Sequence, residues 1–404
     1  MQKGFSDFLQ KQTRIWWLTS INILAAFTTM LFSFKLWIHT RVFPNIPISP
    51  QLPDLAYPFD YLLFGLALMC LVFLFFQRKR KWMLGFLGLA LLLCMLDQMR
   101  WQPWFYLYLL FFGLLLIVHG ERSNKKREAI LFTVAALICS MMYFWSGVHK
   151  LHPSFAKFVY PYLVETFGME IDKGKMVHTV LAYGMALSEL GIGLALFWKP
   201  SRNYAIVAAL GMHLFILVIL GPFGRSENLI IVPWNLAMMA LVVAVFYKND
   251  LISLQSMRLP STLETNVARW GIVLLVVVMP FFSHFGKWDY YLSNTLYAGK
   301  TSRLMVVMPA EYQEELPPSV KEHVKPVSNT PLFVYINTDV WALKELNVPV
   351  YPEARVQYKI ADFYCNYFRQ SNNKGLLFRI DSRWESKKVL EQFECKDRRE
   401  ENSN

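Results

Sequence analysis

Two ionisable residues lie deep inside long apolar stretches, Glu189 within residues 186–190 and His213 within residues 211–214. A charge in hydrocarbon is costly, so such residues mark ion pairs, ligand sites or proton relays. The turn between the two stretches falls near residue 200, and about 1.5 Å of rise per residue puts both groups roughly 15 Å from it. We therefore expect antiparallel neighbouring helices in which Glu189 and His213 face each other. Such a pair would either lock the helices together or handle protons.

A second set of ionisable side chains lies where apolar stretches end on the other side. The set comprises Asp97, Arg100, His149, Lys150, His152, Arg225, Glu227 and His284. Lys150 is the strongest candidate, because it ends an apolar run just after Gly147, and glycine lets helix backbones pack closely. A lysine in a desolvated pocket can lose its proton and act as a base. For Arg225 and Glu227, solvated loop charges are the favoured interpretation.

The composition predicts an all-α polytopic membrane bundle followed by a small extracytoplasmic α/β domain. Of 404 residues, 55% are hydrophobic and only 17% are charged, against about 25% in soluble proteins. Charges are sparse up to about residue 285 and become ordinary afterwards. The predicted domains are therefore residues 1–287 and 288–404. Although the net charge is +12, the basic residues come in short bursts between apolar stretches, which is typical of membrane topology and not of nucleic-acid binding.

About nine apolar ranges are long enough to cross a membrane as helices. They are residues 15–37, 59–77, 82–97, 103–119, 129–149, 177–198, 203–222, 229–247 and 269–285. The third is short for a crossing. The runs are continuous and not alternating, which excludes a closed barrel.

Basic residues between these ranges predict the orientation of the chain. They gather within residues 3–14, 78–81, 122–127, 199–202 and 248–269. Nine crossings put all five segments on one side, so the N-terminus is expected in the cytoplasm and residues 288–404 outside. Compact loops suggest a bacterial inner membrane, with lipid as the surroundings.

The C-terminal domain shows a mixed pattern. Strand-like runs occur at residues 303–308, 331–336 and 376–380, and helical patterns at 355–368 and 386–393. Cys365 and Cys395 lie in this domain, and an oxidising compartment would permit a disulfide between them, which the sequence leaves open. Cys70, Cys94 and Cys139 lie in apolar runs as small core residues. No zinc-type cysteine spacing occurs, so no metal site is predicted.

Residues 143–151 read Tyr-Phe-Trp-Ser-Gly-Val-His-Lys-Leu, which resembles the Tyr-Phe-x-x-Gly-Val-x-Lys-Leu motif of vitamin K-dependent gamma-glutamyl carboxylase and of the wider HTTM family of bacterial membrane proteins. A second segment, with Asp97, Trp101 and Tyr106, resembles another shared stretch. Glu189 and His213 fall where that group carries an acid and a histidine. The resemblance covers roughly residues 10–285. Trp104 differs, since it stands at the position of a family histidine.

The resemblance implies a quinol-linked enzyme. Lys150 would be the base that deprotonates a reduced quinone, menaquinone or vitamin K-like, and the resulting anion would attack oxygen. Asp97, Glu189 and His213 would be further catalytic residues. The quinone would be contacted by three other side chains, Trp101, Tyr106 and His149. This hypothesis predicts a cavity at Lys150 with Asp97 nearby.

Two other functions remain open. The chain could be a non-catalytic membrane subunit whose residues 288–404 bind a periplasmic, cell-surface or membrane protein. That alternative predicts an exposed apolar patch on the outer domain and no cavity at Lys150. A transporter with Glu189 and His213 as proton relay is less favoured, because no inverted repeat or pair of broken helices is evident.

Overall fold

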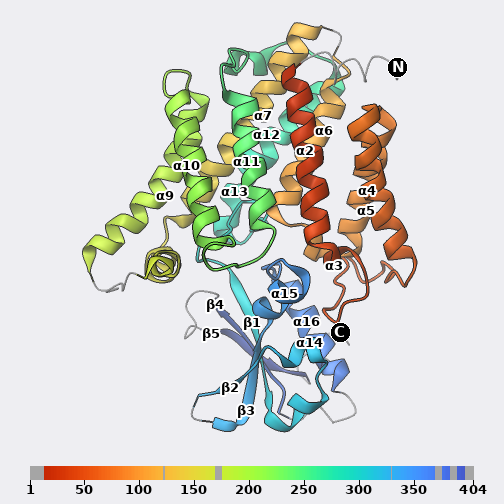
Figure 1. Ribbon diagram of the computed structural model, residues 1–404, viewed down its shortest axis with the longest axis vertical. Coiled ribbons are helices and arrows are strands. Elements are labelled where there is room, and N and C mark those ends of the chain that lie inside the picture. The colour runs from red at the N-terminus through yellow and green to blue at the C-terminus, as the bar shows by residue number, and fades with distance from the viewer. Residues whose placement is uncertain are drawn as a thin grey trace.

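The computed structural model describes residues 13–121, 123–168, 175–328, 330–368, 375–382 and 389–395. It is mostly helical, and its C-terminal part forms a five-stranded antiparallel sheet. Most long helices run side by side along the long axis, and the sheet lies at one end of them (Figure 1). The mixed architecture expected from the composition is therefore present at this level.

The helical part contains long helices joined by short ones. They are α2 (Thr13–Phe32), α3 (Phe34–Trp37), α4 (Phe59–Gln77), α5 (Arg80–Leu96), η1 (Gln98–Arg100), α6 (Pro103–Val118), α7 (Asn124–Lys150), η2 (Phe155–Val159), α8 (Tyr160–Val164), η3 (Glu165–Phe167), α9 (Met176–Phe197), α10 (Arg202–Leu220), α11 (Ile231–Phe246), η4 (Leu254–Arg258), α12 (Leu263–Val273), η5 (Leu274–Val278), α13 (Met279–Phe282) and η6 (Ser283–Phe285).

Six helical segments in the described residues are long and apolar enough to cross a membrane: α2, α4, α7, α9, α10 and the continuous run Leu263–Phe285. The helices α6 and α11 are apolar but have only 16 residues each, and α5 has 17. Each of the nine expected ranges thus contains a helix. Length and hydropathy alone support a membrane protein, while the count of nine crossings stays a prediction.

Helix α7 is the centre of the helical part. In its most apolar window 78% of the residues are buried, against 28% for α9 and 33% for α10. Side chains that α9 and α10 leave exposed include Val180, Leu187, Val207 and Leu214. Apolar faces of this kind suit a lipid environment, because nothing else in the described chain covers them.

Contacts between the basic segments gather them at one end of the bundle. Arg14 donates to the carbonyl oxygens of Tyr247 and Lys248, both at 2.7 Å. Arg202 donates to the Asn249 carbonyl at 2.6 Å. This end lies opposite the sheet (Figure 1). Three of the five basic segments therefore meet at the end of the bundle away from the sheet.

The sheet has the strand order β2-β3-β1-β4-β5, with every pair antiparallel. Its elements are β1 (Ser302–Pro309), η7 (Ala310–Glu315), α14 (Pro318–Lys321), β2 (Val324–Val327), β3 (Thr330–Asn337), α15 (Thr338–Leu346), α16 (Ala354–Tyr367), β4 (Leu377–Ser382) and β5 (Val389–Glu394). The central strand β1 pairs Val306 with Ile336 on one side and with Phe378 on the other. The three expected strands and the helix at 355–368 are confirmed.

The helix expected at residues 386–393 is wrong where the structure describes it. Residues 389–394 form the edge strand β5, which pairs Phe393 with Phe378 of β4. Only Phe393 of this strand is buried. The spacing of apolar residues in the strand therefore could not distinguish a strand from a helix. Pairing with β4 decided its conformation, as tertiary context commonly does for strands.

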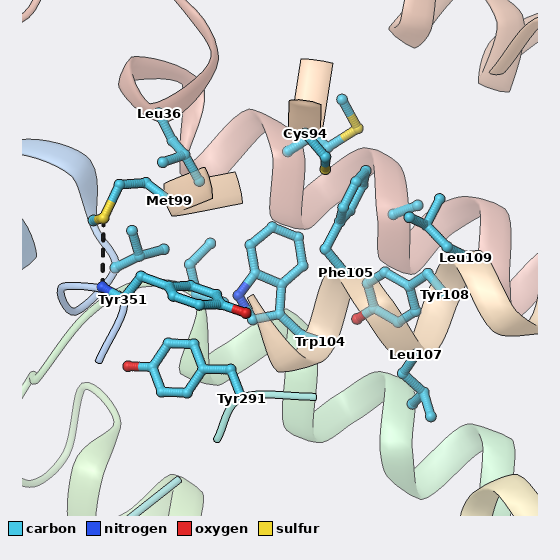
Figure 2. Close-up of a cluster of buried hydrophobic side chains, with 14 of the residues drawn as sticks. Leu36, Cys94, Met99, Trp104, Phe105, Leu107, Tyr108, Leu109, Tyr291 and Tyr351 are labelled. Atoms are coloured by element: carbon cyan, nitrogen blue, oxygen red, sulfur yellow. Dashed lines mark hydrogen bonds between the residues drawn. The ribbon is translucent and has the colours of Figure 1, made fainter. Parts of the chain in front are cut away.

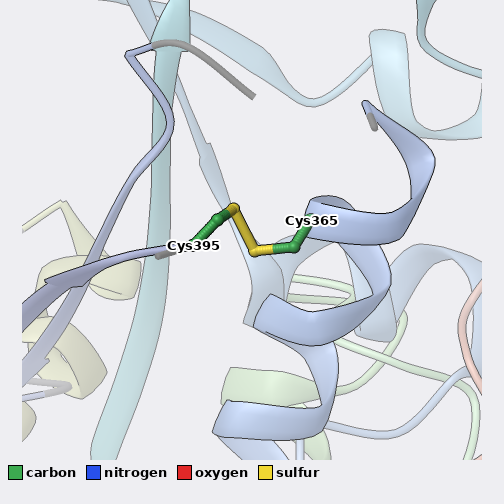
Figure 3. The surroundings of a disulfide bond; sticks show 2 residues. All are labelled: Cys365 and Cys395. Atoms are coloured by element: carbon green, nitrogen blue, oxygen red, sulfur yellow. A yellow bond between two sulfur atoms is a disulfide. The ribbon is translucent and has the colours of Figure 1, made fainter. Parts of the chain in front are cut away.

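The structure decides the question of the disulfide that the sequence left open. Cys365 of α16 is bonded to Cys395, which follows β5, and their Cα atoms are 5.7 Å apart (Figure 3). The bond ties the edge of the sheet to the helix that covers it.

One cluster of buried apolar side chains extends from the helices into the C-terminal part. At the junction, Trp104 of α6 lies beside Tyr291 and Tyr351, and the Tyr351 amide faces the Met99 sulfur (Figure 2). The ring centroids of Tyr291 and Tyr351 are 5.0 Å apart. The boundary at residues 287–288 stays a prediction.

Candidate functional site

A cavity of about 430 Å³ lies between α7, α9, α10 and α11. Its walls are mostly apolar, and its polar lining comes from Tyr143, Ser146, Lys150, Glu189, His213 and Asn235, among others. The short helices η2 and α8 supply Phe155 and Leu163, and the segment before β1 supplies Leu296 and Tyr297. This size and lining are typical of sites for small ligands.

Lys150 and Glu189 form an ion pair at this cavity. Lys150 Nζ donates to Glu189 Oε2 and to Ser146 Oγ, both at 2.6 Å. Their side chains are 13% and 14% exposed, so the pair is shielded from bulk water yet still reachable. Lys150 therefore acts as a hydrogen-bond donor to a carboxylate. That role differs from the neutral base expected from the sequence.

Two glycines bring the paired residues together. A Cβ at Gly147 of α7 would lie 2.5 Å from the Leu190 nitrogen, and one at Gly193 of α9 would lie 2.5 Å from the Ser140 carbonyl oxygen. Real Cβ atoms essentially never come so close, so the backbones of α7 and α9 cross in direct contact only because both positions lack side chains. The crossing lies between Ser140 and Lys150, which sets Lys150 against Glu189.

His213 belongs to a separate polar chain. Its Nε2 lies 2.6 Å from Tyr143 Oη, and its Nδ1 lies 2.8 Å from Asn235 Oδ1. Asn235 Nδ2 donates to the Ile231 carbonyl at 2.7 Å. Because a carbonyl only accepts, the amide nitrogen must face Ile231 and its oxygen must face His213. His213 therefore carries its proton on Nδ1, and Nε2 accepts the hydroxyl proton of Tyr143.

Glu189 and His213 do not form the expected direct pair, because each bonds to another residue. No hydrogen bond joins them within the part of the chain that the structure describes; each bonds to α7, the helix between them. Tyr143, Ser146 and Lys150 share one face of α7. Lys150 Nζ reaches back to Ser146, and the backbone of Ser146 lies roughly one helical turn, about 5 Å of rise, from that of Tyr143.

Asp97 lies outside this cavity. Its carboxylate accepts a hydrogen bond from Arg41 and another from the Met99 amide, the latter at 3.0 Å, and Arg100 Nε is 3.9 Å away. All three charged side chains are almost completely buried. Asp97 therefore neutralises two buried guanidinium groups and caps η1. The expectation that it stands near Lys150 is wrong, because the chain turns at η1 and continues into α6.

The remaining expected quinone contacts are also elsewhere. Neither Trp101 nor Tyr106 lines the cavity, and Tyr106 is buried in α6. Trp104, at the position of the family histidine, packs on Phe105 and Tyr108 with ring centroids 5.6 and 6.2 Å away. Its indole is part of the junction core and takes no part in the polar chain.

His149 is fully buried beside Lys150 but faces another direction. Its ring stacks on His284 with centroids 4.6 Å apart and lies 5.9 Å from Trp145. It does not line the cavity. The side chains of consecutive helix residues point about 100° apart. Lys150 therefore faces the cavity, whereas His149 faces His284.

Several residues of the site carry roles that the sequence did not reveal. Tyr143 and Ser146 belong to the carboxylase-like motif, and their spacing to Lys150 places them on one helix face. Asn235 lies in an apolar run, where an amide signals a buried partner. Arg225 and Glu227, expected to be solvated, instead hold α8 in place: Arg225 donates to Thr166 Oγ1 at 2.8 Å, and Glu227 accepts from Tyr162.

Carboxylates also gather at the junction between the helices and the sheet. Asp289 accepts a hydrogen bond from Tyr351 at 2.5 Å. Burial, and then the nearby Asp289, raises the pKa of Glu353 to about 7. The folded protein thus binds the Glu353 proton more tightly than the unfolded chain does.

We expect the stability of the protein to fall as pH rises through this window. Between about pH 4.5 and 7 the Glu353 carboxyl is protonated in the folded state but ionised in the unfolded chain. The contribution of protonated Glu353 to the free energy of unfolding is therefore fully present below pH 4.5 and lost above about pH 7. Glu353→Gln should match the wild type near pH 5 and melt at a higher temperature at pH 8. Thermal unfolding of both proteins across this range measures the effect. Parallel melting curves at every pH would contradict it.

Comparison with known proteins finds no matching family model, no matching curated protein and no matching solved structure. The resemblance to the carboxylase group therefore depends on the quoted residues alone.

Proposed function

We propose that this chain is an integral membrane protein of nine crossings that binds a reduced quinone in the cavity between α7, α9, α10 and α11, and deprotonates it. The observation that carries the proposal is the pairing, on one apolar cavity, of a shielded Lys150–Glu189 ion pair with the Tyr143–His213–Asn235 chain. An apolar ring fits the walls, and its two oxygens match the two polar groups.

The residues present fit such a ligand. Lys150 has three N–H donors and uses two of them on Ser146 and Glu189. Tyr143 donates its proton to His213 and keeps an acceptor site on its oxygen. A reduced quinone would supply the acidic hydroxyl and the electrons of any later reaction.

The hydrogen-bond directions suggest which groups move the proton. Tyr143 Oη would accept the ligand hydroxyl proton while passing its own proton to His213 Nε2, and Asn235 would hold the doubly protonated ring through Nδ1. The Tyr143 hydroxyl, which then carries the ligand's proton, would donate to the negative oxygen that remains, and Lys150 would donate to the second oxygen of the ring. In this arrangement His213 is the base and Lys150 orients the ring through its second oxygen, which differs from the role that the resemblance implies for the lysine.

The arrangement of the chain also supports the proposed topology. Basic segments gather at the end opposite the sheet, which by the positive-inside rule is the cytoplasmic end. The disulfide suits a sheet outside the cytoplasm. Both agree with a bacterial inner-membrane protein related to the HTTM group, with the N-terminus inside and residues 288–404 outside.

Binding of a reduced short-chain naphthoquinone to the purified protein tests the proposal. We expect saturable binding that Lys150→Gln weakens at least about tenfold, because one charge-assisted hydrogen bond is lost. Lys150→Gln alone leaves the Glu189 carboxylate without its cation. Changing both residues to glutamine removes both charges, and so separates the loss of the lysine from the effect of that unpaired carboxylate. Lys157→Gln changes an exposed lysine outside the cavity lining and should bind normally.

Tyr143→Phe separates proton transfer from binding. It should retain most of the affinity but lose the absorbance change that accompanies deprotonation of the bound quinol. Absence of saturable binding to the wild type, or equal affinity in the Lys150 and Lys157 variants, would refute the proposal.

One feature favours the alternative of a partner-binding subunit. The edge strand β5 leaves Val389 and Leu390 exposed at 44% and 53%, and an exposed sheet edge can accept a strand from another protein. The cavity at Lys150 weighs against this alternative as the sole function. Failure of quinol binding would make the sheet edge the better candidate.

A further inference from the structure

A cluster of basic side chains lies at the ends of the helices, near the C-terminal part and apart from the cavity lining. Lys300 Nζ is 2.9 Å from His284 Nδ1. The ring of His284 stacks on the buried ring of His149, with centroids 4.6 Å apart. His284 is exposed and Lys300 is partly exposed, so a molecule from outside can reach the cluster.

The cluster lacks a negative partner. No carboxylate forms an ion pair with Lys300 anywhere in the described ranges, and neither ring nitrogen of His149 has a side-chain partner there. The Ser293 backbone is the polar group that approaches the His149 ring. An ammonium that has no carboxylate partner within the described ranges favours an anionic acceptor from outside the chain.

Exposed phenylalanines adjoin the basic cluster. Phe281 and Phe285 are 49% and 62% exposed, and the Phe281 ring lies 6.5 Å from His284 and 5.3 Å from Phe285. They end the apolar run Leu263–Phe285, one of the segments able to cross a membrane. Aromatic residues at the end of such a segment are typical of the membrane–water interface.

We propose that His284 and Lys300 bind the phosphate of an anionic phospholipid, whose chains lie along Phe281 and Phe285. Lys300 would donate to a phosphate oxygen, with the N–H of His284 as a second donor. If Lys300 keeps its hydrogen bond to His284 Nδ1, the proton of that imidazole lies on Nε2, free to donate. Basic pockets between membrane helices recognise anionic head groups in this way.

The site does not depend on the proposed quinol chemistry. His284 packs on the face of α7 that carries His149, whereas the cavity is lined by the face that carries Lys150. A lipid bound to this cluster would also contact both the end of α13 and the segment that leads into β1. Loss of this site should therefore leave quinol binding unchanged.

Binding of short-chain phosphatidylglycerol to the purified protein in a neutral detergent tests the proposal. We expect Lys300→Gln and His284→Gln each to weaken binding about tenfold, as loss of a charge-assisted or strong hydrogen bond does. Lys325→Gln, which removes an exposed lysine from the edge strand β2, should bind like the wild type. Melting temperatures of the variants confirm that they fold.

Two further ligands identify the source of the phosphate. Phosphatidylcholine of equal chain length should bind more weakly, because its head group has no net charge. Inorganic phosphate should also bind more weakly, because it lacks chains for the phenylalanines. Phosphatidylglycerol affinity that is equal in the Lys300 and Lys325 variants would overturn the site. Equal affinity of the wild type for phosphatidylglycerol and either other ligand would overturn the assignment to an anionic lipid.

Discussion

Gly193→Ala is expected to destabilise the protein by about 3 kcal/mol or more and to abolish ligand binding at the cavity, because overpacking against backbone cannot be relieved by side-chain rotation. The added Cβ would lie 2.5 Å from the Ser140 carbonyl oxygen and 2.7 Å from the Phe144 nitrogen. To avoid both atoms α9 must move away from α7, which separates Glu189 from Lys150. Thermal unfolding in detergent and quinol binding measure the two effects.

Gly191→Ala is the matched control. A Cβ at Gly191 meets nothing within 4 Å, yet it lies on the same helix and gains the same helix propensity from alanine, about 1 kcal/mol. This variant should be as stable as the wild type or slightly more stable. If both alanine variants behaved alike, the close crossing of α7 and α9 would not be what positions the ion pair.

Asp97→Ala is expected to cost about 3–5 kcal/mol of stability, because it leaves the charges of two buried guanidinium groups uncompensated. Asp97 is bonded to Arg41 and lies beside Arg100, and the side chains of all three are at most 4% exposed. The variant should unfold at a much lower temperature. Whatever fraction stays folded should bind quinol normally, since Asp97 does not line the cavity.

The exposed pair of Asp250 and Lys199, at 2.8 Å, provides the control for this prediction. Its side chains are 78% and 73% exposed, so Asp250→Ala should change stability little. A variant of Asp97 that melted normally but lost quinol binding would contradict the structural role of this carboxylate. That result would restore the catalytic role implied by the resemblance.

The positions of the apolar helices, and of the strands that have a buried face, follow from the amino-acid sequence alone. Nine apolar ranges each contain a helix, because a run of that length must satisfy its backbone internally wherever it is buried. A short apolar run placed β1, and the 3.6-residue period placed α16. The edge strand β5 differs from its expected helix because only Phe393 of it faces the core.

The partners of the ionisable residues, in contrast, depend on how the helices pack. The sequence locates Glu189 and His213 at one depth, but helix rotation decides what each side chain faces. Contact at Gly147 and Gly193 turned Glu189 toward Lys150 and left His213 to Tyr143 and Asn235.

Asp97 shows the same dependence over a longer distance. Its partner Arg41 lies 56 residues earlier in the chain. No pattern in the sequence around either residue predicts that they meet. Periodicity defines the face of one helix, whereas the distance between two functional atoms depends on how closely two backbones pack.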